Sequence, residues 1–268
     1  MAYLEQKNPI AETGIQVSPL GLGTVKIGRD KAVKYPDGFQ IPDDEQVIAL
    51  LEQAWESGIN LIDTAPAYGR SEQRLGELLK KVRREWIIAT KAGEYFDAVS
   101  GESHYDFTPE SLIKSIENSL KTLQQDALDI VLIHSDGNDE HIIRHHGALE
   151  VLADLKQRGW IRASGMSTKT VTGGMLTLEQ SDIAMVMHNL QYEEEQAVIE
   201  QAAKLNKGIF IKKALGSGHL AKQAGTDTVQ DNFDFIFNEP AVSSVIIGTI
   251  NPAHLYDNIS KAVKALAE

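Results

Sequence analysis

The segment INLIDTAPAYGRSEQRLGELL, residues 59–79, places an apolar run directly before a carboxylate, a tyrosine and a helix pattern. The run ends at Asp63, and Tyr68 follows five residues later. Leu75, Leu78 and Leu79 then recur at the spacing that puts side chains on one face of a helix. This order is typical of a β-strand followed by its crossover helix in a parallel sheet.

The same order recurs along the whole chain, which predicts eight parallel strands joined by helices. A doubly wound sheet usually has fewer strands and a glycine fingerprint after the first one, whereas GLGTVKIG, residues 21–28, does not match G-x-G-x-x-G. We therefore predict an α/β fold, a (β/α)8 TIM barrel, with residues 1–268 as one domain. The expected strands cover residues 20–24, 59–64, 85–91, 128–134, 161–167, 183–189, 208–214 and 244–249.

Capping residues mark the expected ends of the helices. Gly58 stands where a glycine commonly ends a helix. Proline is tolerated at the first position of a helix because its missing N–H has no partner there. The expected helix starts are Asp43 or Asp44, Ser71, Thr108 with Pro109, and Asn251 with Pro252.

Composition narrows the class of function. The formal net charge is −12 and the pI is about 5.1, so a basic face for nucleic acid or anionic lipid is not expected. The chain has no cysteine, which excludes disulfides and thiolate sites. It shows neither a leader pattern nor a long apolar span. We expect a cytoplasmic enzyme that acts on a small molecule, with no nucleic-acid or membrane partner, and the oligomeric state stays open.

Polar residues end most of the expected strands. In a barrel of this kind the active site lies at the carboxyl ends of the strands, so these side chains converge although they are far apart in sequence. Three ionisable groups in succession on neighbouring strands favour catalysis over turn or cap roles. The strand-end residues are Thr24, Asp63, Lys91, His134, Ser167, Lys212 and Gly248.

Four of the residues at this mouth suggest proton transfer to a carbonyl oxygen. An ammonium at Lys91 would favour the phenolate of Tyr68 and lower a pKa that is ordinarily about 10. Asp63 would keep a partly buried Lys91 charged. His134 could donate a second hydrogen bond to the substrate oxygen beside Tyr68. No side chain supplies hydride, so a nicotinamide cofactor is implied.

The segments GLGT, DTAPAYG, TK, LIH, GWIRASGMST and LGSG resemble, in this order, the signature segments of the aldo-keto reductase superfamily. The resemblance covers nearly the whole chain and implies an NAD(P)(H)-dependent oxidoreductase. In it Asp63, Tyr68, Lys91 and His134 are catalytic, with Tyr68 as general acid or base. It also implies a hairpin over residues 7–18 that closes the barrel floor, with Gly14 at its turn. We also expect that no long C-terminal tail, which many members have, follows the last helix.

The resemblance further implies a cofactor site. Thr168 stands where members usually have Asn, Met185 where they have Gln, and Lys212 where many have Tyr. Gly248 and His254 replace basic residues that pair with the 2′-phosphate, yet the balance still favours NADP(H) over NAD(H). The implied cofactor-binding residues are Gly23, Thr24, Asp63, Ser167, Thr168, Lys212, Leu215, Gly216, Ser217, Gly248, Thr249, Asn251, His254 and Asn258, with Asp257 a weaker match beside the adenine.

Several alternatives remain open at this point. Lys91 could form a Schiff base in an aldolase-type lyase, or the protein could be a non-enzymatic nicotinamide-binding regulator. The substrate, an aldehyde, ketone or sugar, would be selected by loops 26–41, 95–105 and 135–146, which include Tyr35 and Tyr105. Histidines 141, 145 and 146 are expected at a solvated helix end and not at a metal, and YEEEQ, residues 192–196, as an acidic helix start.

Overall fold

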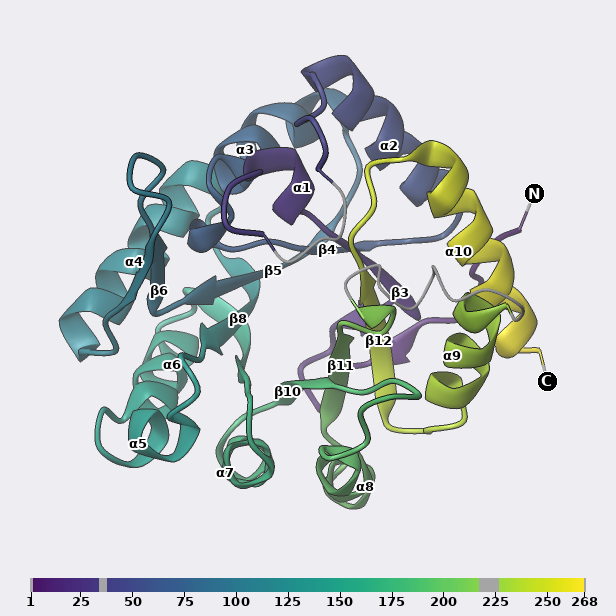
Figure 1. Cartoon of the computed structure of the whole chain (residues 1–268). Coiled ribbons are helices and arrows are strands. Elements are labelled where there is room, and N and C mark those ends of the chain that lie inside the picture. Colours follow the sequence, from purple (N-terminus) through teal and green to yellow (C-terminus); the bar gives the residue numbers. More distant parts are fainter. Residues whose placement is uncertain (1, 34–37, 217–226, 268) are drawn as a thin grey trace.

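Eight parallel strands close into a barrel in the computed structural model, which describes residues 2–33, 38–216 and 227–267 (Figure 1). The strands follow one another around the barrel in chain order, and the last pairs with the first, Val245 opposite Leu20. All eight predicted strands are confirmed. They are β3 (Leu20–Gly23), β4 (Leu61–Asp63), β5 (Ile87–Ala92), β8 (Leu128–His134), β9 (Ile161–Ser167), β10 (Ile183–Met187), β11 (Gly208–Lys212) and β12 (Val242–Ile247).

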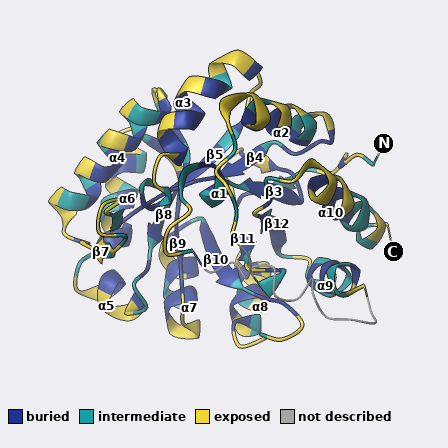
Figure 2. Cartoon of the chain, turned by 45° about the horizontal axis from the view of Figure 1, so that its top comes forward, coloured by how far each residue is buried: buried dark blue, intermediate teal, exposed yellow. Residues whose placement is uncertain are grey.

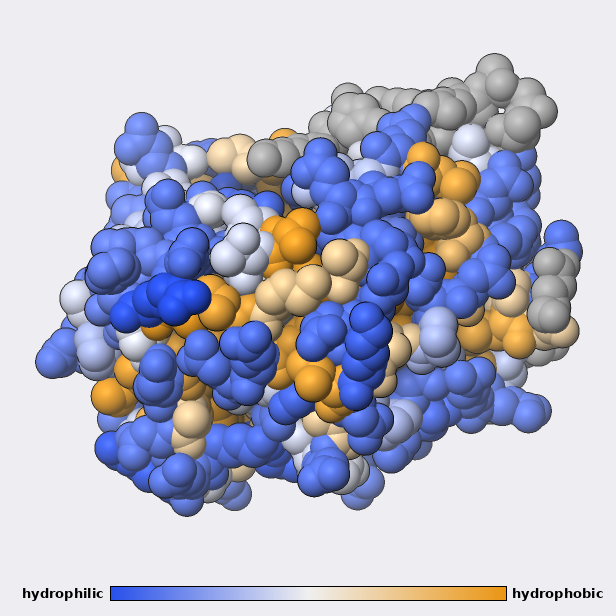
Figure 3. Space-filling view, turned by 90° about the horizontal axis from the view of Figure 1, so that it is seen from below, coloured by the Kyte–Doolittle hydropathy of each residue, from blue (hydrophilic) through white to orange (hydrophobic). Residues whose placement is uncertain are grey.

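Helices surround the barrel, with buried residues on their inner faces and exposed residues on their outer faces (Figure 2), and most of the buried residues are apolar. Figure 3 shows the face of the molecule below α7 and α8. Hydrophilic residues predominate on this face, and its apolar residues form separate groups. None of the helices in the described ranges is long and apolar enough to cross a membrane. The helices are α1 (Val25–Gly28), α2 (Asp44–Glu56), α3 (Ser71–Val82), α4 (Pro109–Leu123), α5 (Asp139–Arg144), α6 (Ala148–Gln157), α7 (Val171–Gln180), α8 (Gln196–Leu205), α9 (Thr228–Phe237) and α10 (Pro252–Ala265).

The expected helix caps hold in part. Asp43 caps α2 by accepting a hydrogen bond from the backbone N–H of Gln46, whose side chain in turn accepts from the N–H of Asp43. Asn251 caps α10 by accepting hydrogen bonds from the backbone N–H groups of Ala253 and His254. The prediction for Ser71 was wrong, because α3 begins at that residue and its hydroxyl instead bonds to Thr24 and Thr64.

The predicted N-terminal hairpin is present as β1 (Asn8–Pro9) and β2 (Gln16–Val17). Gly14 lies at its turn with φ +76°, a conformation that favours glycine. Ile10, Ile15 and Val17 are fully buried among the inward-facing residues of the barrel strands. The hairpin therefore closes one end of the barrel with apolar side chains and leaves the other end for the site.

A second hairpin, β6 (Glu94–Phe96) and β7 (Ser103–Tyr105), lies between β5 and α4. The sequence interpretation treated this stretch as a loop. It starts at Gly93, where φ is +102° and a Cβ would lie 2.6 Å from the ring of Phe107. The hairpin carries Glu94 and Tyr105 back over the barrel mouth, next to the end of β8.

Candidate active site

A cavity of about 880 Å³ opens at the carboxyl ends of the strands. Its volume lies within the range of small-molecule and cofactor sites. Each of the eight barrel strands contributes its last or next-to-last residue to the wall, as the barrel geometry predicts. These residues are Gly23, Asp63, Lys91, His134, Ser167, Met187, Lys212 and Ile247.

The strand-end ion pair is formed as predicted. Nζ of Lys91 lies 2.6 Å from Oδ1 of Asp63 and donates a second hydrogen bond, of 2.9 Å, to the backbone oxygen of Thr64. Both charged side chains are buried, with about 2% and 5% of their surface exposed. A buried charge without a partner is costly, so Asp63 holds Lys91 in its ammonium form.

Tyr68 ends a short 3-10 helix, η1 (Pro66–Tyr68), that follows β4 directly. The Lys91 ammonium lies 4.7 Å from the centroid of its ring, and the ring meets His134 edge-on with centroids 6.2 Å apart. The structure therefore brings together all four residues that the sequence predicted as catalytic. A cation this close to the ring stabilises the negative charge of a phenolate, which is shared between the ring and the oxygen.

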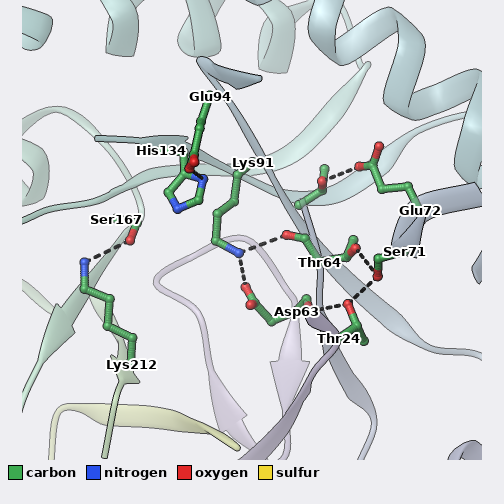
Figure 4. A network of polar contacts seen from close by, with 11 residues as sticks. Thr24, Asp63, Thr64, Ser71, Glu72, Lys91, Glu94, His134, Ser167 and Lys212 are labelled. Atoms are coloured by element: carbon green, nitrogen blue, oxygen red, sulfur yellow. Dashed lines mark hydrogen bonds and ion pairs between the residues drawn. The ribbon is translucent and has the colours of Figure 1, made fainter. Parts of the chain in front are cut away.

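A chain of hydrogen-bonded hydroxyl groups holds the backbone of Asp63, the acidic partner of the ion pair (Figure 4). The Thr24 hydroxyl donates to the backbone oxygen of Asp63 at 2.8 Å, and Ser71 donates to Thr24 at 2.8 Å. Thr64 and Ser71 share a further hydrogen bond of 3.0 Å. Thr24 is buried and is not among the residues that line the cavity, and its hydroxyl is engaged by the backbone of Asp63.

His134 has an ionised partner that sequence reasoning missed. Its Nδ1 lies 2.7 Å from Oε2 of Glu94, at the start of β6 (Figure 4). Burial works to raise the pKa of Glu94, but contacts with His134, Ser103 and Arg29 outweigh it and lower that pKa to about 2. Burial lowers the pKa of His134 below its usual 6.5, and Glu94 opposes that shift. The pair is therefore a carboxylate beside an imidazole.

Lys212 reaches across the mouth from β11 to β9 (Figure 4). Its ammonium donates to the hydroxyl of Ser167 at 3.0 Å and to the backbone oxygen of Thr168. Burial lowers the pKa of Lys212 to about 8, while the charge of Glu195 works in the opposite direction. Met185, at the position of the family's glutamine, is buried and offers no hydrogen bond to a carboxamide.

The interpretation of YEEEQ, residues 192–196, as an acidic helix start is incomplete, because Glu195 is buried in the site. Only about 1% of it is exposed, and its carboxylate accepts hydrogen bonds from the Thr168 hydroxyl at 3.2 Å and the Met187 N–H at 2.9 Å. Burial raises the pKa of Glu195. It lines the cavity and supports Thr168, one of the predicted cofactor residues.

The far end of the cavity lies against α10 and contains most of the residues predicted for the cofactor phosphates and adenosine. Two predicted residues do not line it. Asn251 is occupied in capping α10, and Gly216 lies outside the wall, while Ser217 falls outside the described residues. Lys261 was not predicted, and it binds Asp227 at 2.9 Å and Asp257 at 2.8 Å. The predicted residues that line this end are Leu215, Gly248, Thr249, His254, Asp257 and Asn258.

Two of the three loops expected to shape the substrate pocket reach the cavity. Arg29 from the first loop lines it, stacks at 3.7 Å on the ring of Phe96 and donates to the backbone oxygen of Ala67 at 2.9 Å. Tyr105 lines it from the second loop. No described residue of the third loop, 135–146, does so, and Tyr35 lies outside the described residues.

At the end of α5 the ring of His141 lies tilted against that of His145, with centroids 4.6 Å apart, and meets the ring of His146 edge-on at 5.0 Å. Within the ranges that the structure describes, no group of three or more histidine or carboxylate side chains is arranged to hold a metal ion.

The comparisons with known proteins agree with this geometry. A model of the "Aldo/keto reductase family" matches residues 19–234. The crystal structure of the Pseudomonas aeruginosa protein PA4992, described as an aldo-keto reductase, is 48% identical, with a TM-score of 0.88 over 99% of this chain and 97% of that one. The uncharacterized oxidoreductase YqkF of Bacillus subtilis is 25% identical over 96% of this chain and 91% of its own length.

A third relative is matched over a shorter stretch. The NADH-specific methylglyoxal reductase of Escherichia coli is 34% identical over 60% of this chain and 51% of its own length. The family match spans most of the chain, and the barrel and the strand-end residues fit it. The chain therefore belongs to the aldo/keto reductase family and is an NAD(P)H-dependent oxidoreductase of that type.

Proposed function

We propose that the protein transfers hydride between a nicotinamide cofactor and a small carbonyl or alcohol substrate, with Tyr68 as general acid and base. One observation carries this proposal: the buried Lys91–Asp63 pair holds an ammonium 4.7 Å from the ring of Tyr68. That charge favours loss of the phenol proton to a substrate oxygen, and in the reverse reaction the phenolate of Tyr68 takes the proton back.

The residues around the cavity fit a dinucleotide. The wall runs from Ser167 and Lys212 at the barrel mouth to Asn258 on α10, so an elongated molecule can lie across it. The hydroxyls of Ser167 and Thr168 and the ammonium of Lys212 would hold the nicotinamide end. When bound, the nicotinamide supplies or accepts the hydride that no side chain can. Gly248, Thr249 and the N-terminus of α10 would face the phosphates.

The preference between NAD(H) and NADP(H) is proposed from the residues at the α10 end of the cavity. The sequence favoured NADP(H) because Thr249, Asn251, His254 and the helix N-terminus could accept a 2′-phosphate. In the structure the side-chain oxygen of Asn251 already accepts from the N–H groups of Ala253 and His254. The ammonium of Lys261 is engaged by two carboxylates. Fewer donors therefore remain for the 2′-phosphate, and we propose that NAD(H) binds at least as tightly as NADP(H).

The substrate is proposed as a small polar aldehyde, ketone or sugar. Arg29 and Tyr105 bring polar groups to the wall near His134, and Val25 and Val33 bring apolar ones. The relative named for methylglyoxal acts, by its name, on a small carbonyl compound. The Schiff-base alternative is disfavoured, because Lys91 is held charged by Asp63 and an ammonium is not a nucleophile. No specific observation favours the regulatory alternative.

The test measures both turnover and cofactor binding for each variant. Oxidation of NADH or NADPH with a panel of aldehydes, ketones and sugars is followed at a wavelength of about 340 nm, the reduced-nicotinamide band. We expect Tyr68→Phe to lose about 100-fold or more in kcat while cofactor binding, measured by fluorescence titration, is retained. Tyr3→Phe, at an exposed tyrosine, is the matched control. Unchanged turnover in Tyr68→Phe would refute the mechanism.

A further inference from the structure

Arg29 places a positive charge in the part of the cavity wall beside Tyr68. It follows α1 directly and lines the wall, as does Lys26 within α1. Its guanidinium stacks on the ring of Phe96 at 3.7 Å. Burial lowers the pKa of Arg29 from its usual value, but a guanidinium stays charged in proteins. The whole chain has a formal net charge of −12, so positive charge at this wall runs against the composition and calls for an explanation.

The backbone of two loops holds the guanidinium in place. Nε donates to the backbone oxygen of Lys31 at 2.9 Å, Nη2 to that of Ala32 at 3.2 Å and Nη1 to that of Ala67 at 2.9 Å. Ala67 directly precedes Tyr68 in η1, so the last bond fixes the cation next to the proposed general acid. A guanidinium has an N–H on Nε and a pair on each Nη. One N–H on Nη1 and one on Nη2 therefore remain as donors.

The charges in this part of the wall add up to a net positive charge. Within the part of the chain that the structure describes, Arg29 donates hydrogen bonds to backbone oxygens only and forms no salt bridge. Glu94 is the wall carboxylate whose charge acts on Arg29. Lys26 adds a second cation to the wall. The charge of Lys91 is balanced by Asp63, so two cations and one carboxylate of the described residues set the local charge.

Apolar side chains line the wall beside these cations. Val25 precedes Lys26 in the chain, and Ala32 and Val33 follow shortly after Arg29. A hydrocarbon segment can pack against such side chains, because its burial removes apolar surface from water. This part of the cavity therefore combines a proton donor, an apolar wall and a cation with two remaining donors.

We propose that Arg29 is a specificity-determining residue that binds a carboxylate of the substrate. The substrate class is then an aldehyde or ketone with a carboxylate at the other end of a short carbon chain. This assignment rests on the proposed function and names the substrate class of the same site. The carbonyl oxygen lies at Tyr68, the carbon chain packs on the apolar wall, and the carboxylate accepts from the two remaining N–H groups of Arg29.

The chemistry of a guanidinium favours this partner. Arginine and a carboxylate pair through two parallel hydrogen bonds, and such charge-assisted bonds are stronger than neutral ones. The single net positive charge of this part of the wall matches a carboxylate, which carries one negative charge. It matches a phosphate less well, because a phosphate monoester carries almost two.

The first test compares substrates that differ only in charge. Aldehydes that end in a carboxylate, from glyoxylate to adipate semialdehyde, are each measured beside their methyl ester with saturating cofactor. At the best chain length we expect kcat/KM to favour the carboxylate by about 30-fold, which is typical of hydrogen bonds to a charged group. No preference at any chain length would overturn the proposal. Turnover of the neutral esters would in that case leave the proposed function standing.

Variants of Arg29 separate recognition of the carboxylate from a structural role. Arg29→Gln should lower kcat/KM for the carboxylate by about 30-fold and that for the ester far less, whereas a structural role predicts an equal loss for both. Arg29→Lys keeps the charge without the paired donors and should keep only part of the preference. The matched control is Arg84→Gln, at an exposed position outside the cavity wall, which should behave as the wild type. A preference that survives in Arg29→Gln would overturn the proposal.

The second test measures binding without turnover. Isothermal titration calorimetry is performed on the protein saturated with oxidised nicotinamide, which cannot reduce an aldehyde. We expect succinate semialdehyde to bind about tenfold more tightly than its methyl ester, and Arg29→Gln to lose the difference. Equal affinities in the wild type would refute the carboxylate site, even if no carbonyl compound is turned over and the proposed function fails. If Arg29→Gln does not fold, the affinities of the wild type and Arg29→Lys decide.

A phosphate is the competing anion, and a third pair of substrates distinguishes it. The preference for glyceraldehyde phosphate over glyceraldehyde is measured in the same assay. We expect this preference to be smaller than that for a carboxylate over its ester. A larger one would show that the site is built for a phosphate and would overturn the assignment.

Discussion

Replacing Lys91 with Met tests the electrostatic core of the site most directly. Met keeps the length of the side chain but removes the ammonium that lies 4.7 Å from the Tyr68 ring. A phenolate spreads its negative charge over the ring and the oxygen; with an effective dielectric constant of about 20, a unit charge at the ring centre would be attracted to the ammonium by about 3.5 kcal/mol. If the transition state carries most of a negative charge on the phenol, the loss corresponds to about 400-fold in rate.

The same change leaves Asp63 buried without a partner. Breaking a buried ion pair from one side costs about 3–5 kcal/mol of the free energy of unfolding. A slow variant could therefore be slow because its fold is damaged. The double variant Asp63→Asn/Lys91→Met separates the two effects, because it leaves no buried charge and should recover most of the stability but none of the rate.

Urea denaturation gives the stability of each variant, and single-turnover absorbance with saturating cofactor gives the rate of hydride transfer. Lys156→Met is the matched control, because it breaks the 2.6 Å ion pair with Asp182 and Lys156 does not line the cavity. We expect its rate to be that of the wild type. A double variant with normal stability and a normal rate would show that the ammonium does not drive proton transfer.

Two further predictions concern the walls of the site. Lys212 loses its ammonium as the pH rises through about 8, so cofactor affinity measured by fluorescence should weaken above that pH in the wild type but not in Lys212→Met. A Cβ on Gly28 would lie 2.2 Å from the backbone nitrogen of Ser71 and 2.3 Å from the backbone oxygen of Tyr68. Gly28→Ala should therefore lose about 1–3 kcal/mol of stability and lower kcat, whereas Gly38→Ala, which has open space, should keep its melting temperature.

The sequence was sufficient to predict the barrel and the convergence at its mouth of the four side chains that we propose as catalytic. The strands are parallel, so the polar residues that end several of the apolar runs lie together at one mouth of the barrel. Asp63, Lys91 and His134 are therefore predictable one strand at a time. Tyr68 was predictable because only a few residues separate it from the end of β4.

The supporting residues could not be predicted in this way, because their partners are distant in sequence. Glu94 stands three residues after Lys91, but its contact with His134 depends on a hairpin whose short strands have no alternating pattern. In the sequence Glu195 cannot be told from any other acidic residue at a helix start. Its burial against Thr168 results from tertiary packing. Ser71 has a capping residue's sequence context, but its hydroxyl bonds to buried neighbours instead.

The pairing that closes the barrel joins the two ends of the chain. β3 pairs with β12, and Asn8 of the floor hairpin donates a hydrogen bond of 2.9 Å to the backbone oxygen of Ser243. During synthesis the ribosome makes β3 first and β12 last, so β3 keeps an unpaired edge until more than 200 residues have followed it. An unpaired edge is a site for aggregation. Completion of this barrel is therefore a late event, and the edge of β3 is exposed to mispairing for most of the time that the chain is being made.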